Sequence, residues 1–166
     1  MNQFRDVVNY VLLFLPVSRF FAVKRFLLSV AGVEVGKEVK VNGRSWFYGR
    51  GKIRIGDRTW IGPGCQFHST NGTLIDIGAD CDVAPEVMFV TGTHKFGTAR
   101  RRAGEGYGEN ITVGDGCWLG TRVTVLGNSC IGNGSFVAAG ALVNSELPEN
   151  SLSAGVPART KRSFDN

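Results

Sequence analysis

Residues 113–148 read VGDGCW LGTRVT VLGNSC IGNGSF VAAGAL VNSELP, a run of six hexads in one register. Each hexad opens with an aliphatic residue, and these openers are Val113, Leu119, Val125, Ile131, Val137 and Val143. The fifth place is small or β-branched in most hexads, as in Cys117, Val123, Ser129, Ser135 and Ala141. A strand alternates with a period of two and a helix repeats about every 3.6 residues. A period of six instead predicts a triangular solenoid, in which each hexad forms one strand and one corner and three hexads complete a coil.

The hexad pattern continues toward the N-terminus with two interruptions. IGDRTW and IGPGCQ follow from Ile55, IGADCD, VAPEVM and FVTGTH follow from Ile77, and a weaker version begins at Val33. Successive coils would stack their strands in parallel, about 4.8 Å apart, with the openers inside the prism. We therefore expect an all-β solenoid with these parts: a helical segment at residues 1–32, a β-helix domain at 33–158 with an excursion loop at 95–110, and a basic tail at 159–166.

The composition agrees with such a fold and argues against a nucleic-acid partner. Of 166 residues, 43% are hydrophobic and 23 are Gly, well above the average Gly content of about 7%. The formal charge is +5, but no recognition helix, RNP-like motif or basic-aromatic stripe is present, so no nucleic-acid partner is expected. The four cysteines form no CxxC pair, which argues against a disulfide framework. Three of them, Cys65, Cys81 and Cys117, take the small inward place and are expected to be buried thiols.

The stretch from Val7 to Gly32 is strongly apolar. It is interrupted by Arg19, Lys24 and Arg25, and its longest unbroken apolar run is far shorter than the ~20 residues of a transmembrane helix. No small-residue cleavage site follows a clean apolar run, so a signal peptide is not expected. We expect two short helices that separate near Pro16. Two roles stay open for residues 7–32: they pack over one end of the solenoid, or they lie on a membrane surface.

Three segments carry a family resemblance: APEVMFVTGTHKFG (84–97), GEGYGENITVGDGCWLGTRVTVLG (104–127) and SAGVPAR (153–159). In combination they resemble the hexapeptide-repeat acyltransferases, in particular the galactoside, maltose and surface-polysaccharide O-acetyltransferases. The resemblance implies a left-handed parallel β-helix, acetyl-CoA as co-substrate and no metal. It also implies a homotrimer with active sites between subunits. The N-terminal segment followed by AGVEVGKEVKV resembles the polysaccharide-biosynthesis branch.

This resemblance implies an O-acetyltransferase that moves an acetyl group from acetyl-CoA to a hydroxyl of a sugar or glycan. Surface polysaccharide or lipopolysaccharide biosynthesis is the expected pathway, and the cytoplasm, at the inner face of the membrane, is the expected location. His94 matches the family's catalytic histidine and ends the hexad FVTGTH, where the repeat stops. The unperturbed histidine pKa near 6.5 suits a general base. The competing interpretation is a structural histidine at a corner.

Counting hexads suggests a partner for this histidine. Ile77 to His94 would be one coil, which places Asp76 at the corner one coil below His94. A carboxylate there would orient the imidazole and stabilise its charged form. The alternative is an exposed corner aspartate without a catalytic role.

The resemblance assigns further residues to the two substrates. Gln66 stands where galactoside-type relatives have an Asn, and the loop HSTNGT (68–73) is shorter than theirs and lacks their acceptor-binding Asp, which predicts a different acceptor. The acceptor side is expected to include Gln66, His68, Glu105, Tyr107 and Trp118. The acetyl-CoA side is expected to include Gly120, Thr121, Ala139, Gly140, Arg159 and Arg162.

Other functions remain to be weighed against this one. N-acetylation of an amino sugar or an antibiotic would use the same scaffold and the same base. A carbonic anhydrase of hexapeptide type resembles a zinc site with three histidines, whereas this chain has only His68 and His94. An ice-binding solenoid would show regular outward Thr rows, which are absent from the sequence. The Arg100–Arg102 triplet is either solvated loop charge or a site for a sugar diphosphate or polyprenyl-linked acceptor.

Overall fold

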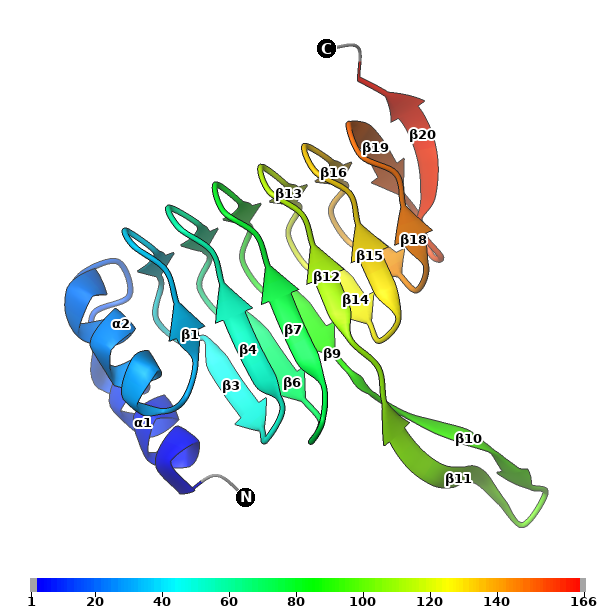
Figure 1. The fold of residues 1–166 in the computed structure, drawn as a ribbon, viewed down its shortest axis with the longest axis horizontal. Coiled ribbons are helices and arrows are strands. Elements are labelled where there is room, and N and C mark those ends of the chain that lie inside the picture. The colour runs from blue at the N-terminus through cyan, green and yellow to red at the C-terminus, as the bar shows by residue number, and fades with distance from the viewer. Residues whose placement is uncertain (1–2, 165–166) are drawn as a thin grey trace.

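Each hexad forms a short strand followed by a tight corner, and the coils stack into a parallel β-helix (Figure 1). The computed structural model describes residues 3–164. Residues 1–2 and 165–166, which belong to the predicted helical segment and basic tail, lie outside this part of the chain. The corners contain backbone with positive φ, which is cheapest for Gly and Asn, as at Gly134 and Asn128. The predicted all-β solenoid is confirmed.

The three walls of the solenoid are parallel sheets, named here by their first strand. The β1 sheet contains β1 (Glu34–Val35), β4 (Lys52–Ile55), β7 (Leu74–Ile77), β12 (Ile111–Val113), β15 (Ser129–Ile131) and β18 (Glu146–Leu147). The β2 sheet contains β2 (Lys40–Val41), β5 (Trp60–Ile61), β8 (Asp82–Val83), β13 (Trp118–Leu119), β16 (Phe136–Val137), β19 (Ser151–Ala154) and the antiparallel β20 (Arg159–Ser163). The β3 sheet contains β3 (Trp46–Gly49), β6 (Gln66–Ser69), β9 (Met88–Val90), β14 (Thr124–Leu126) and β17 (Leu142–Val143).

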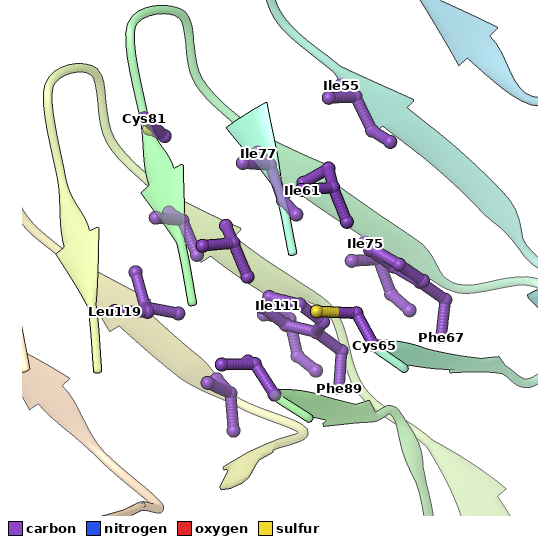
Figure 2. Close-up of a cluster of buried hydrophobic side chains, with 14 of the residues drawn as sticks. Ile55, Ile61, Cys65, Phe67, Ile75, Ile77, Cys81, Phe89, Ile111 and Leu119 are labelled. Carbon is purple, nitrogen blue, oxygen red and sulfur yellow. The ribbon is translucent and has the colours of Figure 1, made fainter. Parts of the chain in front are cut away.

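The core fills the interior of this prism. All six openers of residues 113–148 are at most 2% exposed, and the five small fifth-place residues are buried as well. Phe47, Phe67 and Phe89 stack one coil above another, with ring centroids 4.6 and 5.1 Å apart. Figure 2 shows Phe67 and Phe89 among the inward isoleucines. Burial raises the pKa of the Cys65 thiol to about 12, so this cysteine is an inert part of the core.

Two helices, α1 (Gln3–Phe14) and α2 (Phe21–Val30), cover the open end of the first coil (Figure 1). Pro16 lies between them, as the sequence predicted. The edge of β3 would otherwise leave backbone groups without partners. Asn9 meets that need, because its side-chain amide both donates to the carbonyl and accepts from the N–H of Phe47, each at 3.0 Å. Among residues 3–164, no helix has the length and apolar character needed to cross a membrane.

The predicted excursion is a β-hairpin that projects from the solenoid (Figure 1). It consists of β10 (Gly92–Thr98) and β11 (Arg101–Gly108). Its start at Gly92 corrects the sequence boundary, which placed residues 92–94 in the last hexad of the coil. Cross-strand pairing of Gly92 with Gly108 and of Thr93 with Tyr107 draws these residues out of the coil.

Candidate active site

His94 lies on the hairpin, two residues after the chain leaves the solenoid. It pairs with Gly106 of β11, and its side chain is exposed to solvent. A Cβ atom on Gly106 would lie 3.4 Å from the Cε1 atom of the His94 ring, so the absence of a side chain there lets the ring pack close to the backbone. The ring nitrogen Nδ1 lies 2.9 Å from the carbonyl oxygen of Gly104.

This hydrogen bond defines the tautomer of His94. A backbone carbonyl can only accept a hydrogen bond, so Nδ1 must carry the proton. In the neutral ring Nε2 then has a free lone pair, and it has no hydrogen-bond partner within residues 3–164. An oriented imidazole with an open Nε2 is the arrangement that a general base requires.

Asp76 is not in the place that hexad counting gave it. In the parallel register Asp76 of β7 pairs with Thr112 of β12, because the coil that begins at Ile77 is completed by residues 111–113 after the hairpin. Its carboxylate instead forms a two-pronged ion pair with Arg54 one coil below. The Asp76 carboxylate raises the pKa of the Arg54 guanidinium through this hydrogen-bonded pair. The expected Asp76–His94 pair is therefore wrong, and the group that orients His94 is the Gly104 carbonyl.

We expect Asp76→Asn to leave the pH dependence of turnover unchanged, because Asp76 is bound to Arg54 on the solenoid wall. The loss of an ion pair whose arginine is largely exposed should lower the free energy of unfolding by at most about 1 kcal/mol. Steady-state CoA release across pH, together with urea unfolding, checks both expectations. A shifted pH profile with unchanged stability would restore Asp76 as the partner of His94.

The other residues that the sequence predicts for the site on this hairpin, Glu105 and Tyr107, lie on β11 and form no hydrogen bond with His94 within residues 3–164. Glu105 is exposed and forms an ion pair with Lys95, with 2.7 Å between the Nζ and Oε2 atoms. Tyr107 is 40% exposed and lies across from Thr93. The arginines of residues 100–102 are all exposed at the tip, away from the solenoid. The hairpin therefore presents one imidazole, one phenol and several unburied charges to whatever lies beside it.

Gln66 and His68 lie near the base of the hairpin. They project from the same side of β6, where His68 Nε2 donates to the Gln66 side-chain oxygen at 3.0 Å. The His68 ring stacks on Tyr48 with 4.7 Å between centroids. These two rings line a hollow of about 440 Å³ that also contains Arg50 and reaches Gly92 at the start of β10. The structure thus adds Tyr48 and Arg50, which stand outside the hexads that the sequence pattern highlights.

Burial in this hollow lowers the pKa of His68 below its ordinary value near 6.5. The unfolded chain then binds a proton that the folded protein resists, so the free energy of unfolding should fall as the pH decreases below about 6.5. Above that pH His68 is neutral in both the folded and the unfolded chain, so it costs the folded protein no stability. Urea unfolding of the wild type and of His68→Asn between about pH 5 and pH 8 measures it. The wild type should lose more stability on acidification than the variant, and parallel curves would contradict the expectation.

Trp118 projects outward from β13, 54% exposed, and stacks on Phe136 of the next coil with 4.1 Å between centroids. It shares a hollow of about 570 Å³ with Trp60, Asp82, Ala84 and Pro85. Sequence reasoning missed Trp60, although it ends the hexad IGDRTW as Trp118 ends VGDGCW. The identical place in the repeat was a usable signal, because the sixth residue of a hexad faces out on the same wall.

Comparisons with known proteins agree with this fold. Residues 110–145 match the family model for the bacterial transferase hexapeptide with six repeats. A putative acetyltransferase of Schizosaccharomyces pombe is 32% identical over 114 residues, which are 69% of this chain and 54% of the relative. Galactoside O-acetyltransferase of Escherichia coli is 29% identical over 130 residues, which are 68% of this chain and 64% of the relative.

A solved galactoside acetyltransferase in complex with coenzyme A superposes with a TM-score of 0.83 at 25% identity, covering 98% of this chain and 82% of that one. The chain belongs to the hexapeptide-repeat transferase family. The left-handed parallel β-helix that the resemblance predicted is thereby confirmed. The chain spans between half and two thirds of the length of the first curated relatives that it matches.

The residues expected to meet the co-substrate of this hexapeptide-repeat protein lie in its C-terminal coils. The N–H of Gly140 donates to the carbonyl of Thr121 at 2.9 Å, and the Gly140 corner faces open space. Thr121 and Ala139 are exposed. The absence of a side chain at Gly120 is required by packing, because a Cβ there would lie 2.5 Å from the backbone nitrogen of Ala139. The wall at Thr121 and Gly140 therefore leaves open space in which a ligand could lie.

Two basic residues continue this surface on β20. Arg159 and Arg162 are both exposed, and the Arg162 guanidinium lies 5.3 Å from the centroid of the Phe164 ring. Arg159 donates only to the carbonyl of its neighbour Ala158, at 2.7 Å. The two guanidinium groups form no ion pair with acids in residues 3–164, so both are available to phosphate groups.

A single copy of this hexapeptide-repeat protein does not gather all predicted residues in one cleft. The hollow at His68 and the hollow at Trp118 share no lining residue, and His94 lines neither of them. His94, Glu105 and Tyr107 stand on the projecting hairpin. No group of three or more His, Cys, Asp or Glu residues within positions 3–164 is arranged to hold a metal ion.

Proposed function

We propose that this protein is an O-acetyltransferase that moves an acetyl group from acetyl-CoA to a hydroxyl of a sugar, with His94 as general base. The observation that carries the proposal is the orientation of His94. Its Nδ1–H is bound to the Gly104 carbonyl, and its Nε2 points to no group of the described chain. The family membership and the coenzyme A complex of the similar galactoside acetyltransferase support acetyl-CoA as the co-substrate.

In the proposed step, Nε2 of His94 takes the proton of the acceptor hydroxyl as the hydroxyl oxygen attacks the thioester carbonyl. The carbon–sulfur bond then breaks, CoA leaves as a thiol after receiving a proton, and the sugar gains an acetyl ester. Proton transfer by a positioned side chain of this kind contributes about 10²–10⁴ to a rate. The Gly104 carbonyl accepts the Nδ1–H hydrogen bond both before and after Nε2 takes the proton, so the ring keeps its orientation.

A sugar as acceptor is supported by the hollow beside the hairpin. Tyr48 and His68 form an aromatic platform that suits the apolar face of a sugar ring, and Arg50 and Gln66 supply polar groups at its edge. Glu105, Tyr107 and Trp118 complete the acceptor side in our proposal. The resemblance of the N-terminal segment to the polysaccharide branch points to a surface polysaccharide or lipopolysaccharide, modified in the cytoplasm.

We place the complete site between subunits of a homotrimer. The hairpin is exposed on both strands, and Phe96 at its centre is 92% exposed, which is unusual for a large aromatic residue without a partner. In a trimer His94 would meet the hollow at Trp118 and the backbone at Gly120, Thr121, Ala139 and Gly140 of a neighbour. Arg159 and Arg162 would then bind the phosphates of the co-substrate.

The test is CoA release from acetyl-CoA against a panel of sugars, nucleotide sugars, lipid-linked glycans and amino sugars. The proposal expects release with a hydroxyl acceptor and an acetyl ester as product, which alkaline hydroxylamine cleaves. Release with an amino sugar alone, and a product stable to hydroxylamine, would replace the proposal with N-acetylation. Light scattering tests the assembly, and a monomer would contradict the intersubunit site.

A further inference from the structure

The N-terminal helices expose an unusual amount of apolar surface. Eleven of the sixteen exposed large hydrophobic side chains in the described structure fall within residues 4–30. On α1 they follow helical spacing, and others lie at the start of α2 and along it; these outward residues are Phe4, Val7, Val11, Phe14, Phe20, Val23, Phe26 and Val30. Phe14 is 85% exposed and Phe26 is 67% exposed. We call this surface the helix face. An exposed patch of this kind marks an interaction site.

The polar residues of the same helices point inward, toward the solenoid. The Arg5 guanidinium donates to the carbonyls of Ala31, Gly32 and Gly49, at 3.0 to 3.2 Å. The Lys24 ammonium is fully buried and donates to the carbonyls of residues 16 and 17, at 2.8 and 2.7 Å. An ordinary surface helix keeps its charges in water and its apolar stripe on the core. Here Arg5 satisfies carbonyls at the edge of the first coil, Lys24 satisfies carbonyls of the linker between the helices, and apolar side chains are left facing out.

The basic charge of the chain gathers at this same end. Residues 1–52 contain nine Lys and Arg, of which Arg5 and Lys24 are buried, against three Asp and Glu, whereas residues 53–166 contain ten Lys and Arg against eleven Asp and Glu. Lys40 and Arg44 are exposed on the first coil, and Arg19 is exposed in the linker between the helices. Arg44 lies beside that linker, because the N–H of Gly43 donates to the carbonyl of Val17 at 2.8 Å. The acidic exceptions on the first coil are Glu34 and Glu38.

We propose that the helix face binds the surface of an anionic lipid bilayer. Apolar side chains on short helices need to enter only the boundary between headgroups and acyl chains, and basic residues around them attract anionic headgroups. A second copy of the chain is a poorer occupant, because two copies joined through this face would bring two surfaces of the same net positive charge together. The charge of the first coil is complementary to anionic lipid.

The experiment is co-sedimentation of the full chain with vesicles of equal parts phosphatidylcholine and phosphatidylglycerol, and with vesicles of phosphatidylcholine alone. The wild type should bind the anionic vesicles, and added salt should weaken binding. The double variant Phe14→Glu, Phe26→Glu should bind at least about a hundredfold more weakly, since each buried Phe is worth about one decade or more in an equilibrium constant. Circular dichroism and thermal unfolding should show that the variant is folded, because both side chains are exposed.

The matched control is Val156→Glu, which adds a charge at an exposed apolar residue near the other end of the solenoid. It should bind anionic vesicles as the wild type does. The proposal is overturned if the wild type ignores anionic vesicles, or if the double variant binds them equally well. It is also overturned if the wild type fails to bind vesicles and the double variant reduces the size of its assembly, because the helix face is then an interface between copies. Acetyl transfer measured without vesicles tests the proposed function separately.

Discussion

Replacing His94 with Ala should lower kcat for acetyl transfer by about 10²–10⁴-fold and leave the fold intact. The side chain is exposed, and its one hydrogen bond within residues 3–164 is to the Gly104 carbonyl, so its loss creates no core cavity. The acceptor hydroxyl would then lose its proton only to water. Removal of the base should affect kcat more than KM, because the imidazole acts in the transition state. Steady-state CoA release, with circular dichroism as the check on folding, measures this result.

Two controls make the His94 experiment specific. Added imidazole should restore part of the activity of His94→Ala, since it replaces the missing base without altering the rest of the hairpin. His68→Ala should instead raise KM for the acceptor, because His68 belongs to the platform with Tyr48 and not to the proton transfer. Equal CoA release by the wild type and His94→Ala would disprove the mechanism and return His94 to the role of a structural residue.

The solenoid could be predicted from sequence because its rule is local and repeated. Each hexad opener is buried because it points into the prism. Six openers in one register have a period that neither an ordinary strand nor a helix shows, and this period indicates a solenoid. The same rule predicts that Trp118 faces outward, and it applies equally to Trp60, which ends its hexad at the identical place. The handedness came only from the family resemblance.

The orientation of His94 could not be predicted in this way. Counting from Ile77 assumed that the coil runs on to His94, whereas strand pairing within the hairpin takes over at Gly92. Such pairing depends on residues on both strands of the hairpin, and most of these lie beyond the last hexad, which ends at His94. The group that orients the ring is the backbone carbonyl of Gly104. Every residue has such a carbonyl, so the sequence does not indicate which one binds the ring. Asp76, the side chain that counting suggested, has its own partner in Arg54.

Replacing Phe67 with Ala should lower the free energy of unfolding by about 3–5 kcal/mol. Phe67 is fully buried and stacks between Phe47 and Phe89, so its removal opens a cavity in the middle of the aromatic column. The walls cannot close over that cavity easily, because parallel pairing of Phe67 with both neighbours fixes the spacing of the coils. The surroundings therefore relax little, and the cost should fall in the upper part of the range. Urea unfolding at one fixed protein concentration measures it.

Phe96→Ala is the matched control, since it removes the same side chain from a residue that is 92% exposed on the hairpin. Its effect on the isolated chain should stay within about 0.5 kcal/mol. The comparison also probes assembly, because a trimer that covers the hairpin would bury Phe96. In that case Phe96→Ala should weaken association and make the unfolding midpoint more dependent on protein concentration, whereas Phe67→Ala should lower stability at every concentration. If Phe67→Ala costs no more than Phe96→Ala, the solenoid does not depend on its aromatic column, and the stacking of coils alone holds it together.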